Sequence, residues 1–189
     1  NPSLVLDWYR FNSWLNVRFL NEQVKIIRRH CPKHFITHNF MGFGTADVNP
    51  YELAKELDFV SFDNYPVWTK PEIKYFSACA ADLTRGFKQK NFWIMEQTSG
   101  PTLSQQIIWR NPRPGEILNI AFQQVAHGAD AIIWFRWRTC TAGQEQYWHG
   151  ILGHDATPSR RYKECKETAF ALHKISDEIE GTTVNSEIA

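Results

Sequence analysis

A single glutamate, Glu96, has the position in this sequence that best suits covalent chemistry. It follows the apolar run Phe92 to Met95 with no turn residue between them, so its carboxylate is expected at the end of a buried strand. A charge in such a place needs a partner, because burying it alone is expensive. Two interpretations are open: a structural ion pair with Arg136 or Arg138, or a carboxylate nucleophile that neighbouring donors keep ionised.

Polar side chains follow every apolar run of the sequence at its C-terminal end. They are His38 and Asn39; Asp63, Asn64 and Tyr65; Glu96 and Gln97; and Arg136 and Arg138. In a barrel of parallel strands these ends share one rim, where the active site is built. Asp63 and Asn64 precede a proline and are also typical of turns. A histidine such as His38, placed at a strand end, serves structure more often than chemistry.

Helical and strand-like segments alternate along the chain. Apolar residues at three- and four-residue spacings predict helices, and short continuous apolar runs predict strands buried on both faces. Ser3 is expected to cap the first helix and Gly181 to end the last one. The expected helices span residues 4–29, 51–57, 71–88, 116–127 and 159–180, and the expected strands lie within 34–41, 59–62, 92–95 and 131–137.

This alternation predicts an α/β fold with a parallel sheet covered by helices. Four strand–helix units form either a small doubly wound domain or half of an eight-fold barrel. A doubly wound sheet usually binds its ligand at one switch point, often with a glycine-rich phosphate loop, and no such motif occurs here. Polar residues at every strand end favour the half-barrel. No linker or low-complexity stretch divides the chain, so residues 1–189 are expected to form one unit.

The charge balance excludes some partners. Lys and Arg number 21 against 20 Asp and Glu, a net charge of +1, which gives no general attraction to nucleic acid or to an anionic membrane. No apolar stretch approaches the roughly 20 residues of a membrane span, and the start does not resemble a signal sequence. The sequence leaves the compartment open, with the cytoplasm favoured.

Cysteine and tryptophan usage bear on the kind of site. The 4 cysteines are widely separated and lack the close pairing of a structural zinc site, so no metal is expected. Aromatic residues make up 14% of the chain and include 8 tryptophans. Such rings can simply fill a core, but they also suit a pocket that stacks against the flat apolar faces of sugar rings.

Several ordered segments resemble one family of sugar-cleaving barrels. These segments are FWIMEQTSG, RPGE, VAHGADAIIWFRWRTC and EQYWHGILGHD, together with NPSLVLDWYRF, ITHNFMGF and FVSFDNYP. They resemble the catalytic barrel of glycoside hydrolase family 42, the β-galactosidases. The resemblance implies a partial TIM (β/α)8 barrel in which this chain supplies about strand–helix units five to eight, the C-terminal half.

The resemblance also implies a mechanism. The family releases terminal β-D-galactose with retention, by double displacement between two glutamates, and its nucleophile ends strand seven, where Glu96 stands. The acid/base glutamate ends strand four, in a segment that this chain lacks. Retention needs the two carboxyls about 5–5.5 Å apart, so the chain alone is expected to be inactive. The chemistry requires no cofactor, and the family suggests a homotrimer for the full-length protein.

Further residues are carried over from the family as substrate-binding candidates. Tyr65 is expected to donate a hydrogen bond to the nucleophile. Glu145 and His149, in the loop after strand eight, are expected to hold galactose hydroxyls, and Trp148 is expected to stack on the sugar or line the pocket. The family places a tryptophan shortly after the nucleophile; Ser104 holds that place here, and Trp109 is expected to fill the same space.

Other functions stay open at this point. The chain could belong to another exo-acting glycosidase of the same barrel type, such as an arabinopyranosidase. It could be a non-catalytic carbohydrate-binding or scaffold module that keeps the aromatic pocket. A small doubly wound regulatory domain that binds a metabolite is a third possibility. That domain predicts a self-sufficient sheet, whereas a half-barrel predicts exposed apolar strand edges.

Overall fold

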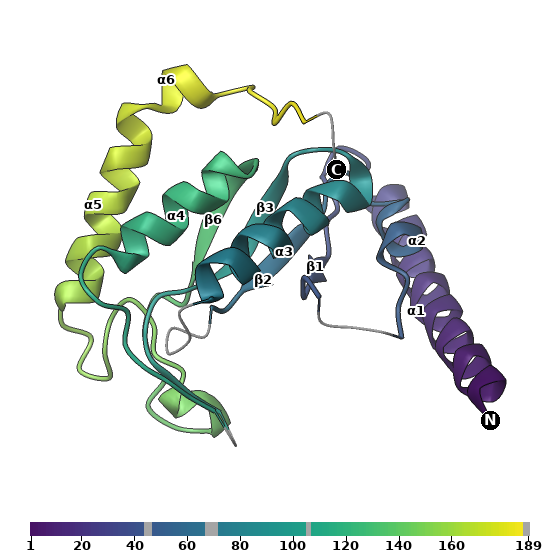
Figure 1. Cartoon of the computed structure of the whole chain (residues 1–189), viewed down its shortest axis with the longest axis horizontal. Coiled ribbons are helices and arrows are strands. Elements are labelled where there is room, and N and C mark those ends of the chain that lie inside the picture. Colours follow the sequence, from purple (N-terminus) through teal and green to yellow (C-terminus); the bar gives the residue numbers. More distant parts are fainter. Residues whose placement is uncertain (44–46, 67–71, 105–106, 187–189) are drawn as a thin grey trace.

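The computed structural model describes residues 1–43, 47–66, 72–104 and 107–186, and for 73–74, 103–104 and 107–109 only the backbone. The chain alternates helices and strands, as Figure 1 shows. The elements are α1 (Pro2–His30), β1 (Asn39–Phe40), α2 (Pro50–Ala54), β2 (Ser61–Asn64), α3 (Ile73–Lys88), β3 (Phe92–Thr98), β4 (Thr102–Ser104), β5 (Ile107–Trp109), α4 (Glu116–Ala126), β6 (Ala129–Phe135), the 3-10 helix η1 (Gln144–Tyr147), α5 (Arg160–Lys174) and α6 (Ser176–Ile179).

The main sheet is parallel and keeps its strands in chain order, β1-β2-β3-β6. In a doubly wound sheet the strand order reverses at a switch point. The strand order of this sheet has no such reversal. Right-handed crossovers that always step the same way place their helices on one face, and α3 and α4 cover that face in Figure 1. The predicted α/β fold is confirmed, and the strand order is that of a barrel segment.

The core lies between this face of the sheet and the helices. Fully buried side chains from β2 and β3 meet α3, and the C-terminal half of α1 closes the same core. Its members include Val60, Phe62, Phe92, Ile94, Ala81, Leu20 and Val24. A smaller cluster of Ile117, Ile151 and Cys165 joins α4 to α5.

The opposite face of the sheet is more open than the sequence suggests. Continuous apolar runs predicted strands buried on both faces, but Trp93 is only partly buried and Ile133 is 43% exposed. Trp93 packs against Phe59 and Phe35 on this face, with ring centroids 4.6 and 5.3 Å away. A closed barrel would cover these side chains with the inward-facing residues of further strands.

Several expected boundaries differ in the structure. The strand expected within 34–41 is limited to Asn39–Phe40, and the helix expected over 51–57 spans Pro50–Ala54. Helix α1 begins at Pro2 and is capped by Asn1, whose side chain accepts from Ser3 N at 3.0 Å. Proline is favoured at the first helical position because an N–H there would have no partner within the helix. The expected helix 159–180 breaks at Ile175. The expected loop after β3 contains the antiparallel pair β4–β5. No helix in the described ranges is long and apolar enough to cross a bilayer.

Candidate active site

Two carboxylates stand side by side where β2 and β3 end. The parallel register aligns Asp63 with Glu96 and Asn64 with Gln97. The register shifts between Phe62 and Asp63, so the pairing differs from that at the start of the strands. Both carboxylates are half-buried, at the C-terminal edge where parallel sheets place their ligands.

Tyr65 provides the closest contact to Glu96. Its hydroxyl donates a hydrogen bond to Glu96 Oε2. Burial raises the pKa of Tyr65 well above its usual range, the bond to Glu96 raises it further, and the nearby Trp148 side chain lowers it. Tyr65 therefore keeps its proton at neutral pH and serves as the donor in its hydrogen bond with Glu96.

The expected alternative, an ion pair between Glu96 and an arginine, is not what the described residues form. The two arginines lie beyond the end of β6. Arg136 Nη1 donates to Glu145 Oε2 at 2.9 Å, and Arg138 Nη2 donates to the His154 carbonyl at 3.2 Å. Neither arginine therefore takes Glu96 as its partner.

Asp63, which the sequence places at a strand end among residues that are also typical of turns, lies in the site. Burial, and then the negative charge of Glu96, raise the pKa of Asp63 to about 6, while a hydrogen bond from Asn39 lowers it. That bond joins Asn39 Nδ2 to Asp63 Oδ1 at 2.9 Å. Two carboxylates this close disfavour simultaneous ionisation, so the rim holds a group that titrates near neutral pH beside Glu96.

A buried network of amide and hydroxyl groups lies directly behind these residues. Asn64 Nδ2 donates to Gln97 Oε1 at 2.9 Å, and Gln97 Nε2 donates to the Asn64 carbonyl at 3.2 Å. Ser77 Oγ donates to Asn64 Oδ1 at 2.8 Å, and Gln124 Nε2 donates to Ser77 Oγ at 3.0 Å. All four side chains are buried. The network ties β2 to β3 and to α3 and α4, one residue beyond the two carboxylates.

The loop after β6 brings a third carboxylate to the site. Arg136 holds Glu145 by its side chain and also donates to its main-chain carbonyl at 2.8 Å. Side chains three residues apart eclipse in a 3-10 helix, which places Trp148 on the same side as Glu145. His149, the next residue, turns away: its ring lies 5.2 Å from that of His154. Burial, followed by the nearby charges of Arg161 and His154, lowers the pKa of His149.

A cavity of about 400 Å³ joins these groups. The lining residues whose side chains could act on or bind a substrate are Asp63, Tyr65, Glu96, Glu145 and Trp148. The other lining residues are Met41, Phe62, Asn64, Pro66, Phe76, Ala80 and Phe135. It thus combines carboxylates with aromatic and apolar walls, as sugar pockets do. Of the expected site residues, Glu96, Tyr65, Glu145 and Trp148 meet here, and His149 is absent from the described lining.

The expected place of Trp109 in the pocket stays a prediction. Its backbone pairs with Thr102 across the β4–β5 hairpin. Its side chain, like that of Ser104, lies outside the described residues. The hairpin nevertheless borders the site, because Thr102 also bridges to Trp148.

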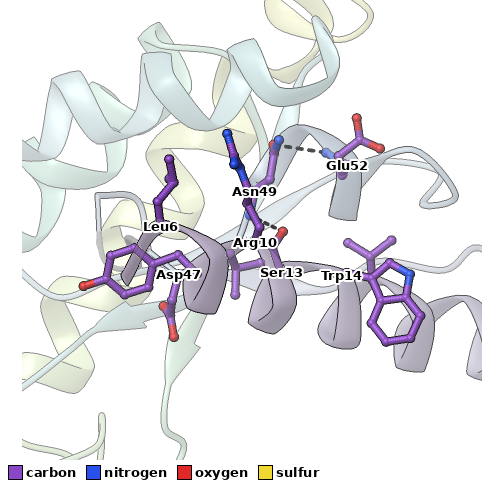
Figure 2. Close-up of a pocket in the computed structure, with 10 residues that line it drawn as sticks. Leu6, Arg10, Ser13, Trp14, Asp47, Asn49 and Glu52 are labelled. Atoms are coloured by element: carbon purple, nitrogen blue, oxygen red, sulfur yellow. Dashed lines mark hydrogen bonds between the residues drawn. The ribbon is translucent and has the colours of Figure 1, made fainter. Parts of the chain in front are cut away.

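Two other cavities lack a comparable arrangement. One of about 410 Å³ lies between α1 and the segment before α2, and Figure 2 shows Arg10, Trp14 and Asp47 around it. Helix and loop residues build it, and no strand ends there. A larger cavity of about 1200 Å³ lies at the opposite ends of the strands, near Asn91 and Asp130. In the described ranges no group of three or more His, Cys, Asp or Glu is arranged to hold a metal ion.

Comparisons with known proteins point to one family. The family model for glycoside hydrolase family 42, described as Beta-galactosidase, matches residues 1–175. The chain is similar to the β-galactosidase BgaA of Clostridium cellulovorans, with 42% identity over 100% of this chain and 29% of the relative. It is also similar to a β-galactosidase of Thermus thermophilus, with 37% identity over 93% of this chain and 29% of the relative.

Solved structures agree with the sequence relatives. The cold-adapted β-galactosidase of Rahnella sp. R3 matches with a TM-score of 0.90 and 31% identity, over 96% of this chain and 27% of that one. The β-galactosidase of Bacillus circulans sp. alkalophilus matches with a TM-score of 0.84 and 35% identity, over 93% and 26%. The chain thus spans under a third of the length of these proteins. The predicted partial TIM barrel is confirmed.

Proposed function

Because the chain belongs to glycoside hydrolase family 42, we propose that it supplies the nucleophile side of a retaining β-galactosidase site, with Glu96 as the nucleophile. The observation that carries this proposal is the contact between Glu96 and Tyr65 at the wall of the cavity. A carboxylate that formed an ion pair with an arginine would have a structural role. A carboxylate that takes a hydrogen bond from a tyrosine and borders a cavity is held in place and remains accessible, as a nucleophile requires.

The proposed reaction has two displacements. A carboxylate oxygen of Glu96 attacks the anomeric carbon of a terminal β-galactoside. The bond from that carbon to the leaving oxygen breaks, and an acid/base glutamate from the preceding half of the barrel protonates the leaving oxygen. Water then attacks the anomeric carbon of the covalent galactosyl ester, gives its proton to the same glutamate, and releases galactose and the Glu96 carboxylate. Tyr65 holds Glu96 Oε2, which leaves Oε1 as the attacking atom.

Glu145 is the proposed sugar-recognition group of the loop. Its carboxylate can accept hydrogen bonds from two adjacent sugar hydroxyls, and Arg136 fixes its position. Trp148 forms a wall of the same pocket. His149 and Trp109 stay predictions: the ring of His149 would have to leave His154 to reach the sugar. The family also leads us to expect a homotrimer for the longer protein.

The proposal implies that this chain is incomplete for turnover. Retention requires a second carboxyl about 5–5.5 Å from the nucleophile, and the family's acid/base glutamate belongs to a strand before β1. We therefore expect activity only when the chain is joined to the preceding strand–helix units of a family barrel. The chain alone should release no nitrophenol from nitrophenyl β-galactoside.

Replacing the nucleophile in that joined enzyme tests the proposal. Glu96→Gln keeps the size of the side chain and removes its charge, and should lower turnover of nitrophenyl β-galactoside by about 10³-fold or more. Glu167→Gln, an exposed change on α5, is the matched control and should leave turnover unchanged. A loss of less than tenfold in Glu96→Gln would reject the nucleophile. If the joined enzyme without any substitution bound galactose but gave no turnover, a carbohydrate-binding module would be favoured.

A further inference from the structure

The residue after Glu96 and the residue before Tyr65 meet on the helix side of the sheet. Successive side chains of a strand point to opposite faces, so Gln97 turns away from the cavity that Glu96 lines. Gln97 and Asn64 are partners in the pairing of β3 with β2, and both side chains are buried. Burying two amides where an apolar pair could pack is costly unless their bonds are made. This amide pair is therefore a candidate for a task that depends on exact position.

The Gln97 amide holds the peptide group that leads into Tyr65. Gln97 Nε2 donates to the main-chain carbonyl of Asn64 at 3.2 Å. That carbonyl belongs to the peptide bond between Asn64 and Tyr65, and β2 ends at Asn64. The Gln97 side chain thus extends the contact between the two strand ends by one peptide group. Since Glu96 directly precedes Gln97, this one residue is connected to both members of the Tyr65–Glu96 hydrogen bond.

Two residues on the helices fix the orientation of the Asn64 amide. Ser77 Oγ of α3 donates to Asn64 Oδ1 at 2.8 Å, and Asn64 Nδ2 donates to Gln97 Oε1 at 2.9 Å. Gln124 Nε2 of α4 donates to Ser77 Oγ at 3.0 Å, which leaves the single hydroxyl proton of Ser77 for Asn64. Both helices cover this face of the sheet in Figure 1. The chain of bonds therefore runs from the outer helices to the strand ends.

We propose that Gln97 is a positioning residue for the proposed nucleophile: by holding the peptide group before Tyr65, it keeps the Tyr65 hydroxyl on Glu96 Oε2. Ser77 is a more distant member of the same arrangement, because it fixes the amide that Gln97 binds. This role depends on the proposed function of Glu96. A purely structural network would lower the free energy of unfolding and leave turnover by the folded enzyme unchanged, whereas a positioning network also lowers kcat.

A double-mutant cycle in the joined enzyme separates these roles. Gln97→Met keeps the length of the side chain and removes its amide; it should lower kcat for nitrophenyl β-galactoside by about tenfold and change KM by less than about twofold. Tyr65→Phe should lower kcat by about 10- to 100-fold. In the Tyr65→Phe background, Gln97→Met should lower kcat by less than about twofold, because the hydroxyl that it positions is gone. Its effect on the urea midpoint should be the same in both backgrounds, because the buried bonds are lost in both.

Two outcomes would overturn the assignment: equal kcat losses from Gln97→Met with and without the Tyr65 hydroxyl, or a lower urea midpoint with unchanged kcat. Thr84→Val is the matched control on α3. Thr84 is buried, and its hydroxyl donates to the Ala80 carbonyl of the same helix at 2.7 Å, so kcat should stay unchanged whatever happens to the midpoint. If Gln97→Met does not fold, Ser77→Ala decides: it should lower kcat by about threefold, and only when the Tyr65 hydroxyl is present.

Azide rescue distinguishes failure of this role from failure of the proposed function. In Glu96→Gly, azide should attack the anomeric carbon of dinitrophenyl β-galactoside, displacing dinitrophenolate and forming α-galactosyl azide. If rescue occurs while the cycle is additive, only the role of Gln97 is wrong. If azide gives no rescue, Glu96 is not the nucleophile and the proposed function fails with it.

Discussion

The cavity is built from two sides that differ in construction. Asp63, Tyr65 and Glu96 come from the ends of β2 and β3, which are paired in register and backed by the buried Asn64–Gln97 network. Glu145 and Trp148 come from a 3-10 helix and the residue after it. The support of this loop side is Arg136, which holds Glu145 through an ion pair whose carboxylate side chain is 57% exposed.

Under the proposed function, this difference predicts separate roles for the two sides. Groups on paired strands are held to within small displacements, which a nucleophile needs because its attack depends on distance and angle. Side chains on a loop can be exchanged without disturbing the sheet, and this suits residues that recognise the hydroxyl pattern of a sugar. Changes on the strand side should therefore affect chemistry and stability. Changes on the loop side should affect substrate affinity.

Shortening Glu96, the proposed nucleophile, should give the largest effect. Glu96→Asp keeps the charge and withdraws the carboxylate by one methylene, and a misplacement of this size costs about 10²-fold or more in rate. We expect kcat for nitrophenyl β-galactoside to fall by that factor in the joined enzyme, with KM and the unfolding midpoint nearly unchanged. A tenfold rise in KM with normal kcat would place Glu96 among the recognition groups.

Breaking the network behind the strands should come next. Gln97→Leu leaves the buried amide of Asn64 without its partner, and an unsatisfied buried group costs about 1–3 kcal/mol. Urea unfolding should show a loss in this range. Adding Asn64→Leu should cost less than a second independent loss, because the two residues are coupled. Fully additive losses would indicate that the two amides do not support each other.

Asp63 should make stability depend on pH. Its pKa is raised to about 6 in the folded state, from an ordinary value of 3.8, so the folded state binds the proton more tightly. The free energy of unfolding contributed by Asp63 is therefore greatest below pH 4 and is lost as the pH rises through 6. Asp63→Asn should stabilise the protein at pH 7 by about 1–2 kcal/mol, discounted for partial exposure, and by little at pH 4.

Asp58 supplies an opposite control for that experiment. A hydrogen bond from Arg28, and then one from the Ile36 N–H, lower the pKa of Asp58. Its contribution is therefore present above pH 4 and is lost in acid. Asp58→Asn should reduce stability at pH 7, in the direction opposite to Asp63→Asn. A loss of stability at pH 7 in both variants would show that the Asp63 carboxylate is favourable where it lies.

Loosening the loop should have the smallest effect. Arg136→Met removes the ion pair and the hydrogen bond to the Glu145 carbonyl, and exposed pairs are worth at most about 1 kcal/mol. We expect KM for nitrophenyl β-galactoside to rise by about three- to tenfold, with kcat within about twofold of the parent. A loss confined to kcat would contradict the division between the two sides of the cavity.

The sequence predicts the strand side better than the loop side. The apolar run Phe92 to Met95 leads into Glu96 without a glycine or proline, so both the strand and the place of its carboxylate follow from local pattern. The role of Tyr65 came from the family resemblance, and Asp63 was placed at the rim without a role in the site. The pairing of Asp63 with Glu96 depends on a register shift between β2 and β3. Such a shift arises from pairing between strands that are far apart in the chain, and local sequence does not predict it.

The loop side depends on the phase of a short helix. Spacing alone does not tell whether Trp148 or His149 shares a face with Glu145, because one residue of 3-10 helix turns the next side chain by about 120°. The β4–β5 hairpin was also missed, since each strand has 3 residues and the segment contains no Asn-Gly or Asp-Gly pair. The cap at Asn1 escaped because Ser3 is an equally good candidate.

Trapping the covalent intermediate tests the role of Glu96 most directly. A 2-deoxy-2-fluoro-β-galactoside with a dinitrophenyl leaving group should react with the joined enzyme and stop at the glycosyl ester, because fluorine slows the second displacement more than the activated leaving group slows the first. After peptic digestion and mass spectrometry, we expect one fluorogalactosyl group on the peptide that contains Glu96. A label on another carboxylate, or an active enzyme that accumulates no label, would contradict the role assigned to Glu96.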